Sequence, residues 1–360
     1  MPLVSVLMAA YNAERYIDQA VQSVLGQAYL DWELIVVNDG STDNTAAQLQ
    51  IWAQRDPRIR LYHNERNLGI GPTRQRALDL AQGIYAAILD SDDVALPEWL
   101  TTRVDYLKRY PNVIAISGSR IVIDECGKRV RLLHEEASPN LLRWRLLFGN
   151  PVNHPSCLFR VKEARQTGGY PAVPYLEDWD LFTKLAEIGK IVHVDTPLVM
   201  YRVHSSNSSL GFGNNRQRLE SVANQIMYRT VMAATGLTIP TQLVWYLFRG
   251  RYVFQGDREE SRRALDFVLK AYRAFLRRND VGMESAAVGA AVLDDASNVL
   301  RCGGWSPMQC VKAFTSIVPC AGARTLLSSA GLRGAMKLLL IPLGRARRYA
   351  TGWNIKNKSK

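Results

Sequence analysis

The stretch Ala86-Ala-Ile-Leu-Asp90-Ser-Asp-Asp93-Val-Ala-Leu-Pro97 decides the fold, because an apolar run ends there in a cluster of carboxylates. Residues 84–89 are almost wholly apolar, which is typical of a short strand buried in a parallel sheet. Asp90, Asp92 and Asp93 follow with no Lys or Arg beside them. Buried anions are costly unless they are neutralised, so the pattern indicates a divalent cation such as Mg²⁺ or Mn²⁺. An acidic turn that caps the next helix is the alternative.

Strands and helices alternate between the N-terminus and this stretch. Apolar runs at residues 4–10, 32–37 and 59–62 indicate strands, and a segment with helical features follows each of them. This alternation predicts an α/β fold with a mostly parallel sheet that helices cover on both faces. Ligands of such sheets bind beyond the carboxyl ends of the strands, where Tyr11, Asp39 and the carboxylate cluster would converge.

The composition is that of a chain with an ample core and no membrane span. The hydrophobic fraction of 47% is ordinary, and no run of about 18 apolar residues is present. Met1 leads directly into a strand-like run with no basic leader, so we expect no signal peptide. The five cysteines have no Cys-x-x-Cys spacing, which favours a reducing cytoplasm over a disulfide framework or a zinc site.

Four stretches and a proline stand in a fixed order in the first third of the chain. They are residues 4–12, 32–43, 67–69 and 89–93, followed by Pro97. In this order and spacing they resemble the family 2 glycosyltransferases of the GT-A fold, and the resemblance extends from about residue 3 to about residue 209. It implies transfer of a sugar from a nucleotide-sugar donor with inversion at the anomeric carbon. A Rossmann dinucleotide site is disfavoured, since no Gly-x-Gly-x-x-Gly follows the first strand.

The net charge of +12 is concentrated in the C-terminal part of the chain. Residues 214–360 contain 23 Lys and Arg and 9 Asp and Glu, a net +14, whereas the preceding residues sum to −2. Such asymmetry predicts two regions with different partners. We expect a GT-A nucleotide-sugar-binding domain with a mostly parallel mixed sheet over residues 1–210. A basic, mainly helical region would follow over residues 211–360.

The resemblance implies a donor site at the ends of the first strands. Tyr11 and the backbone near Ala9 would flank the nucleobase, since an aromatic ring suits stacking on a base. Asp39 would accept the imide hydrogen of uracil or thymine, and Arg74 would approach the base or the phosphates. The alternatives are that Tyr11 packs on the sheet, that Asp39 caps a helix, and that Arg74 lies on a solvated helix face shared with Arg76.

The carboxylate cluster and a later Tyr-Arg-x-His motif would form the diphosphate site by the same resemblance. Asp92 would bind the metal directly, and Asp90 would lie at the ribose or in the outer metal shell. Asp93 would orient that shell or cap the next helix. His204 would give a neutral nitrogen to the metal or touch the diphosphate, and Arg202 would neutralise it. A bound cation offsets the charge that develops on the departing diphosphate.

A second carboxylate block, residues 177–180, would supply the general base. Inverting transfer needs one base for the proton of the acceptor hydroxyl. The resemblance indicates Asp178 for this role, with Glu177 as second choice, although a helix N-terminus lowers the pKa of a carboxylate. His154 and Trp179 would line the acceptor side. The alternatives are acids that only favour the helix dipole and a structural histidine in a turn.

The predicted function is therefore metal-dependent inverting transfer from a UDP- or dTDP-linked sugar to a glycan or lipid-linked acceptor in cell-surface polysaccharide synthesis. A non-catalytic nucleotide-sugar binder on the same scaffold is one alternative. A sugar nucleotidyltransferase is another, but it would need a Gly- and Lys-rich loop where residues 11–15 stand. The sequence leaves the sugar, the acceptor and the oligomeric state open.

The end of the chain suggests a further partner. Residues 338–343 are apolar, and the Arg345, Arg347 and Arg348 side chains follow directly. An apolar segment beside cations suits an anionic membrane surface. We therefore expect a cytoplasmic protein with peripheral attachment to the inner face of the plasma membrane. A solvated basic tail and a homodimer interface are the alternatives, and nucleic acid is disfavoured because no recognition motif is present.

Overall fold

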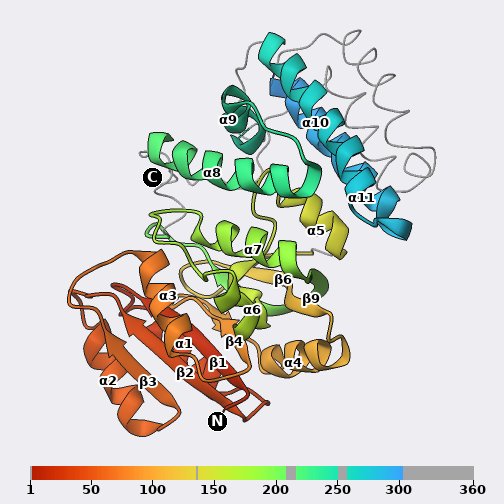
Figure 1. Cartoon of the computed structure of the whole chain (residues 1–360). Helices are drawn as coiled ribbons and strands as arrows, with labels where there is room; N and C mark the ends of the chain where they lie inside the picture. Colours follow the sequence, from red (N-terminus) through yellow and green to blue (C-terminus); the bar gives the residue numbers. More distant parts are fainter. Residues whose placement is uncertain (1, 135–136, 208–215, 250–257, 303–360) are drawn as a thin grey trace. The chain divides into compact units, whose positions relative to one another are not determined.

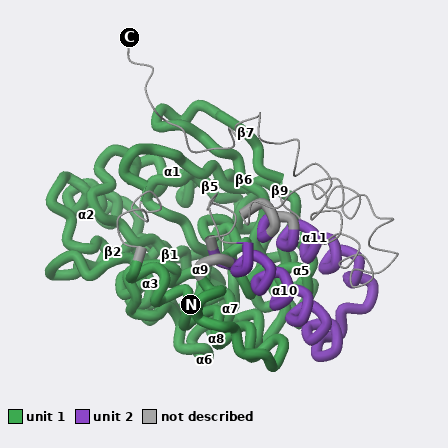
Figure 2. The backbone as a smooth tube through the Cα atoms, turned by 90° about the horizontal axis from the view of Figure 1, so that it is seen from above, with its two compact units in different colours: residues 1–245 green, residues 246–360 purple. Residues whose placement is uncertain are grey.

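The computed structural model describes residues 2–134, 137–207, 216–249 and 258–302 (Figure 1). The chain divides into two compact units, Met1–Trp245 and Tyr246–Lys360 (Figure 2). Helix α8 (Arg216–Thr235) packs against α7 (Glu177–Ile188) in the first unit. The residues beyond 210 therefore contribute to both units.

One mixed sheet of nine strands lies within the described part of the first unit. The strand order is β3-β2-β1-β4-β8-β6-β9-β5, with β7 also paired to β6. The first four strands in sequence run parallel (Figure 1), and β8 is antiparallel to both of its neighbours. In chain order the strands are β1 (Val4–Ala10), β2 (Trp32–Asn38), β3 (Ile59–His63), β4 (Tyr85–Ile88), β5 (Val94–Ala95), β6 (Val113–Ile123), β7 (Arg129–Leu133), β8 (Leu158–Arg160) and β9 (Lys190–Arg202).

Helices alternate with the first four strands, as the sequence pattern predicts, and helices also make up the described part of the second unit. The α/β class, the mostly parallel mixed sheet and a helical C-terminal part are thereby confirmed. The remaining helices are α1 (Ile17–Leu25), α2 (Thr45–Arg55), α3 (Ile70–Leu80), α4 (Trp99–Arg109), α5 (Pro139–Arg145), the 3₁₀ turn η1 (His154–Ser156), α6 (Val161–Gln166), α9 (Thr241–Arg249), α10 (Arg258–Arg278), the 3₁₀ turn η3 (Gly282–Glu284) and α11 (Ser285–Cys302).

Both faces of the central strands are buried, which accounts for their continuous apolar sequence. Val6 and Met8 of β1 share one core cluster with Ile17 and Val21 of α1, and all four are fully buried. Burying a side chain of this size contributes roughly 1.5–3 kcal/mol. The core therefore fixes the strand ends, and the loops at those ends occupy defined positions.

β6 and β9 are the longest strands of the described sheet, and each continues through residues that interrupt its apolar pattern. The parallel pairing of these two strands shifts register between Gly118 and Arg120. A bulge lets a strand continue through such an interruption.

Local geometry at two helix ends departs from the simple sequence pattern. Asn12 does not cap α1, which begins at Ile17 with Tyr16 as its N-cap. Asn12 has a left-handed backbone (φ 48°), and its Oδ1 accepts the backbone N–H of Thr42 at 2.8 Å. Ile188 ends α7 and is 51% exposed, although its spacing matches that of the buried Leu181 and Leu185.

The second unit is helical in its described part. Apolar residues of α10 such as Val268, Tyr272 and Phe275 are buried, and α10 packs against α11. No helix within the described ranges combines the length and the apolar character that a membrane crossing requires.

A glycine allows α3 to approach the segment that leads into α7. A Cβ atom added to Gly71 would lie 2.6 Å from the carbonyl oxygen of Pro171 and 3.1 Å from that of Val173. Both obstacles are backbone atoms, which cannot move aside as a flexible side chain can. This close approach places α3 beside the start of α7, where Glu177 lies 3.5 Å from the added atom.

We predict that Gly71→Ala lowers the free energy of unfolding by about 1–3 kcal/mol, the usual cost of overpacking. Alanine favours a helix over glycine by up to about 1 kcal/mol, and this gain would offset only part of the free-energy cost of the steric clash. Equilibrium urea unfolding followed by circular dichroism measures the change. Gly149→Ala is the matched control, since nothing lies within 4 Å of its added Cβ, and it should change stability by less than about 0.5 kcal/mol. Equal stability of both variants would refute the close packing.

Candidate active site

The ends of β1 and β2 place the first candidate residues beside each other. The backbone N–H of Asp39 donates to the carbonyl of Ala10 at 2.8 Å. Ala9 is half-buried within β1, and Tyr11 directly after that strand is 48% exposed. The Tyr11 ring is accessible to a planar ligand, because it does not pack into the sheet.

Asp39 holds the glycine-rich loop before α3. Its Oδ1 accepts Asn64 Nδ2 at 2.6 Å and the Leu68 N–H at 2.9 Å, and its Oδ2 accepts the Gly69 N–H at 3.0 Å. At the first turn of α2 the carboxylate that binds the backbone is Asp43 and not Asp39, since Asp43 Oδ1 accepts the Thr45 N–H. Two sequence motifs that are about 30 residues apart thus form one structural unit, and Gly69 has the left-handed φ of 91° that glycine adopts freely.

Arg74 joins two carboxylates from distant parts of the chain. Its Nη2 lies 2.6 Å from Asp90 Oδ1, and its Nη1 binds Glu177 Oε1. The Arg74 side chain is largely buried, so the alternative of a solvated helix face does not hold for it. Arg76 is engaged as well, since its Nη1 donates to the His63 carbonyl at 2.6 Å.

The carboxylate block at the start of α7 lies in a buried environment. Leu176, just before it, has a left-handed backbone with φ 64°. Burial raises the pKa of Glu177 to about 7 despite the opposing charge of Arg74. Burial likewise raises the pKa of Asp178, against the effects of Arg74 and of two hydrogen bonds. The helix N-terminus was expected to lower these values, and desolvation outweighs it here.

Asp178 differs from the other acids of this block in its partners. Glu177 pairs with Arg74, and Asp180 pairs at 2.6 Å with both Lys184 and Arg229. Within the described ranges Asp178 has no salt bridge. Its Oδ1 accepts the Trp179 N–H at 2.7 Å, and its Oδ2 accepts Asn150 Nδ2 at 2.9 Å. The interpretation that all three acids only favour the helix dipole fails for Glu177 and Asp180, which serve ion pairs.

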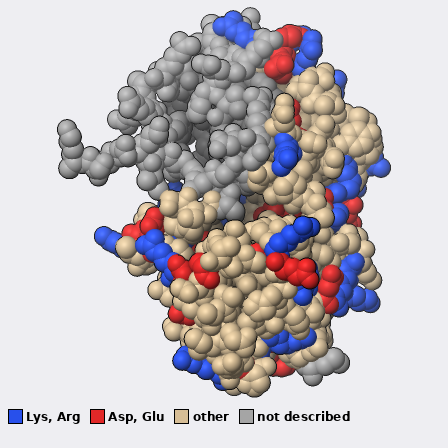
Figure 3. Space-filling view, turned by 90° about the vertical axis from the view of Figure 1, so that its left-hand side faces the viewer, with Lys and Arg blue, Asp and Glu red and all other residues tan. Residues whose placement is uncertain are grey.

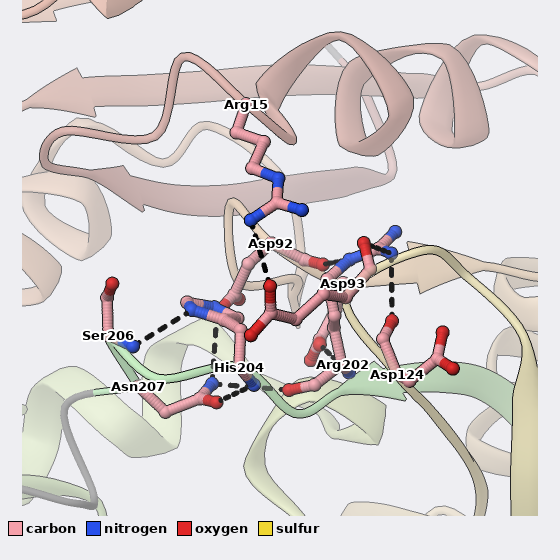
Figure 4. Close-up of polar contacts among 9 residues, drawn as sticks. Arg15, Asp92, Asp93, Asp124, Arg202, His204, Ser206 and Asn207 are labelled. Atoms are coloured by element: carbon pink, nitrogen blue, oxygen red, sulfur yellow. Dashed lines mark hydrogen bonds and ion pairs between the residues drawn. The ribbon is translucent and has the colours of Figure 1, made fainter. Parts of the chain in front are cut away.

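Asp92 and His204 meet although they are 112 residues apart (Figure 4). His204 Nε2 lies 2.8 Å from Asp92 Oδ2, and His204 Nδ1 accepts the Ser206 N–H at 3.3 Å. This network assigns the proton to Nε2, which donates it to Asp92. Asn207, which the sequence analysis missed, donates to the same Asp92 oxygen at 3.3 Å and accepts the His204 N–H at 2.6 Å. Its position three residues after His204 was the available signal.

The residues present can supply part of a metal site. In the portion of the chain that the structure describes, no group of three or more His, Cys, Asp and Glu side chains is placed to hold a metal ion. Asp92 and His204 offer two ligands, whereas Asp90 is engaged by Arg74. Mg²⁺ commonly takes only one or two protein ligands, with water and substrate phosphates completing its octahedron. The pair therefore fits a cation that is bound together with a phosphate ligand.

The Arg202 guanidinium, which was expected to neutralise a diphosphate, makes its contacts with groups of the protein itself. Its side chain is buried, and its Nε donates to the Asp92 carbonyl at 2.8 Å. Its Nη2 donates to Gln19 Oε1 at 2.7 Å, and its guanidinium lies 4.5 Å from the centre of the Tyr16 ring. The Arg202 backbone N–H donates to Asp93 Oδ1 at 2.8 Å. Arg202 therefore anchors the carboxylate loop to β9 and α1.

Asp93 is fully buried in that loop. Its Oδ2 has no hydrogen-bond partner among the described residues. Burial, and then the neighbouring charges of Asp92 and Asp90, raise the pKa of Asp93 well above its usual range. The side chain accepts from β9 and does not cap α4, whose N-cap is Glu98. Asp93 thus supports the position of the loop.

His154 and Trp179, which the resemblance places on the acceptor side, are both buried. His154 Nε2 lies 2.9 Å from the Tyr170 hydroxyl, and burial lowers the pKa of His154 well below its usual range. The imidazole is therefore neutral at physiological pH. The Trp179 side chain is fully enclosed, and its Nε1 donates to the Leu146 carbonyl at 2.9 Å. Both side chains therefore belong to the buried packing around α7.

Comparison with known proteins decides the family. The family model described as Glycosyl transferase family 2 matches residues 5–165. An uncharacterised glycosyltransferase of Haemophilus influenzae is 33% identical over 221 residues, which cover 58% of this chain and 68% of that protein. The chain belongs to glycosyltransferase family 2.

Other similarities extend this result. The chondroitin synthase of Escherichia coli is 28% identical to this glycosyltransferase over 216 residues, which are 58% of this chain and 30% of the synthase. The crystal structure of S. aureus TarS 1–349 in complex with UDP-GlcNAc has a TM-score of 0.56 at 17% identity, covering 95% of this chain and 91% of that one. At this identity the structural likeness shows the fold alone.

The match to the family model covers only part of the candidate site of the glycosyltransferase. Tyr11, Asp39, Arg74 and Asp92 lie within residues 5–165, whereas Asp178 lies beyond them. His204 also lies beyond the match. The structure brings these later residues to the same region through Arg74 and through the contact of His204 with Asp92.

Proposed function

We propose that this glycosyltransferase moves a sugar from a UDP- or dTDP-linked donor to a glycan or lipid-linked acceptor, with inversion, in cell-surface polysaccharide synthesis. The observation that carries the proposal is the environment of Asp178. It is a carboxylate of raised pKa with no salt bridge in the described part of the chain, and Arg74 links the neighbouring Glu177 to Asp90. The similarity to a chondroitin synthase supports a polysaccharide product.

Donor binding is assigned to the ends of β1 and β2. The exposed Tyr11 ring would stack on the base, and the backbone near Ala9 would border it. Among the described residues, Asp39 Oδ2 accepts one hydrogen bond, from the Gly69 N–H. Because a carboxylate oxygen has two acceptor positions, it can also take the imide hydrogen of uracil or thymine.

Asp92 and His204 would hold a Mg²⁺ or Mn²⁺ ion against the donor diphosphate. Once bound, such a cation stabilises negative charge on the departing nucleoside diphosphate. For His204 to bind through Nε2, the proton that it donates to Asp92 must move to Nδ1, which then gives up the Ser206 N–H. Asp90 remains with Arg74 in this proposal and would face the ribose.

Asp178 would act as the general base. It takes the proton of the acceptor hydroxyl while that oxygen attacks the anomeric carbon from the side opposite the diphosphate. The bond from the sugar to the diphosphate oxygen breaks in the same step, so the configuration inverts. Glu177 is less suited, because Arg74 occupies it. A non-catalytic nucleotide-sugar binder and a sugar nucleotidyltransferase are the alternatives, and assays of transfer distinguish them.

We predict that Asp178→Asn lowers turnover roughly 10²–10⁴-fold, the usual cost of losing a general base, with donor affinity nearly unchanged. A screen of nucleotide sugars by donor hydrolysis first identifies the substrate. In the wild type, activity should fall as pH decreases through a pKa above the ordinary aspartate value of about 3.9, since the base must be ionised and burial raises its pKa.

The exposed Asp105→Asn on α4 is the matched control for this charge change. If Asp178→Asn loses donor affinity but turns over bound donor normally, Asp178 is a donor ligand. Glu177→Gln then tests the second choice for the base.

We predict that Asp92→Ala and His204→Ala each abolish transfer and leave the fold intact. Titration of Mn²⁺ in the presence of UDP, followed by electron paramagnetic resonance, should show at least about tenfold weaker binding in each variant. Full wild-type activity in excess chelator, or equal Mn²⁺ affinity in all three proteins, would refute the metal site.

The basic end of the chain is proposed to attach the protein to an anionic membrane. On the face that Figure 3 shows, basic and acidic side chains of the described residues are interspersed. The charge excess lies instead in residues 303–360, which contain ten Lys and Arg and no Asp or Glu. Residues 338–343 and the cations after them lie outside the described residues, so the proposal rests on sequence alone.

We predict that the full chain sediments with vesicles that contain phosphatidylglycerol and that binding weakens as salt is raised, because surface attraction is screened. Vesicles of phosphatidylcholine are the control, and a truncation that ends near Met336 should bind less. Equal recovery with both kinds of vesicle, or no binding at low salt, would refute attachment. Analytical ultracentrifugation would then test the region as a homodimer interface.

A further inference from the structure

Asn150 contacts the candidate base from outside α7. It lies in the segment between α5 and η1, and its Nδ2 donates to Asp178 Oδ2 at 2.9 Å. Its own Oδ1 accepts the Val152 N–H at 3.0 Å. Because the amide oxygen is used by Val152, the amide cannot flip without losing both bonds. The N–H group is therefore directed at Asp178.

We propose that Asn150 is a positioning residue for the reaction, one that holds the Asp178 carboxylate in a fixed orientation and stabilises its ionised form. The inference rests on the proposed role of Asp178 as the base. Asn150 would touch neither the donor nor the acceptor, and it would act only through Asp178.

The segment that carries Asn150 is firmly attached to the sheet. Asn153 Nδ2 donates to the Gly118 carbonyl at 3.1 Å, and Ser117 Oγ donates to the Asn153 carbonyl at 3.0 Å. Both side chains are buried. At the end of the same segment, His154 Nε2 lies within hydrogen-bond distance of the Tyr170 hydroxyl, which attaches the segment to the residues before α7. A group presented by such a rigid support can fix its partner within the narrow geometry that catalysis requires.

Asn150 supplies one of two hydrogen bonds to a carboxylate that lacks a salt bridge in the described chain. The other comes from the Trp179 N–H, which lies on the same helix as Asp178. A donor that binds the ionised form of an acid favours that form. The hydrogen bond from Asn150 therefore favours the ionised form of Asp178, and it fixes the direction in which the remaining acceptor positions of the carboxylate point.

Other ionisable groups also face Asp178 and bear on its protonation. They are Arg74 on α3, Glu177 beside it on α7, Asp90 after β4 and Tyr170 before α7. In the described structure none of them forms a hydrogen bond or an ion pair with Asn150. Substitution of Asn150 therefore changes the titration of Asp178 without removing these groups.

Asn150→Asp is the decisive variant. An aspartate has the same shape and can still accept the Val152 N–H, so a purely structural role is retained. It cannot donate to Asp178 when ionised, and it places a second negative charge beside it. We expect the acid limb of the pH dependence of kcat to move to higher pH by about one unit or more. At a fixed pH on the acid limb, kcat should fall about tenfold for each unit of this shift, while the donor KM and the thermal midpoint change little.

Asn150→Ser retains a short donor and should recover part of the lost kcat. Asn112→Asp, at an exposed position before β6, is the matched control for the added charge and should leave the pH dependence unchanged. A wild-type acid limb and kcat in Asn150→Asp would overturn the inference and leave Asn150 as a structural residue of its turn.

The double variant Asn150→Asp/Asp178→Asn separates this inference from the proposed function. If Asp178 is the base, Asp178→Asn removes the acid limb, and adding Asn150→Asp lowers kcat no further. Full activity of Asp178→Asn alone would refute the base assignment and this inference with it. Loss of activity in Asp178→Asn with an unchanged pH dependence in Asn150→Asp would refute only the role of Asn150.

Discussion

The ion pairs of Arg74 are the interaction on which the candidate site depends. One largely buried guanidinium binds Asp90 at the end of β4 and Glu177 at the start of α7. Those carboxylates are 87 positions apart in the sequence, and each would be costly to bury alone. Arg74 can reach both because Gly71, one turn earlier on α3, permits the close approach to the segment before α7. The pairing also leaves Asp178 without a cationic partner in the described chain, which separates its chemistry from that of Glu177.

The fold was predictable because its signal is local and repeated. Apolar runs followed by helical segments identify the parallel strands, and the core burial of Val6, Met8 and Ile17 follows from that pattern. The same reasoning located the strand ends where Tyr11, Asp39 and Asp92 lie. Such reasoning does not reach places where geometry departs from the average period, as in the bulged pairing of β6 and β9. A bulge is set by the partner strand, and a single strand's sequence does not reveal its partner.

The direction in which a charged side chain points was harder to predict. Arg202 was expected to face the diphosphate, and the structure uses its guanidinium to bind carbonyls and Gln19 inside the protein. An arginine that binds a ligand and an arginine that binds the protein backbone are identical in the sequence and can stand in the same motif. Tertiary hydrogen bonds decide between them. For the same reason Asn150 and Asn207 escaped notice, since each acts through a residue that is far away in the sequence.

The bond network of Asp39 has a consequence for how donor preference can evolve. The carboxylate that would read the base is oriented by N–H groups of Leu68 and Gly69 and by the amide of Asn64. A substitution in this loop would tilt the carboxylate without touching the base itself. Selectivity among nucleotides can therefore change through substitutions of residues that do not contact the substrate, while Asp39 itself is unchanged.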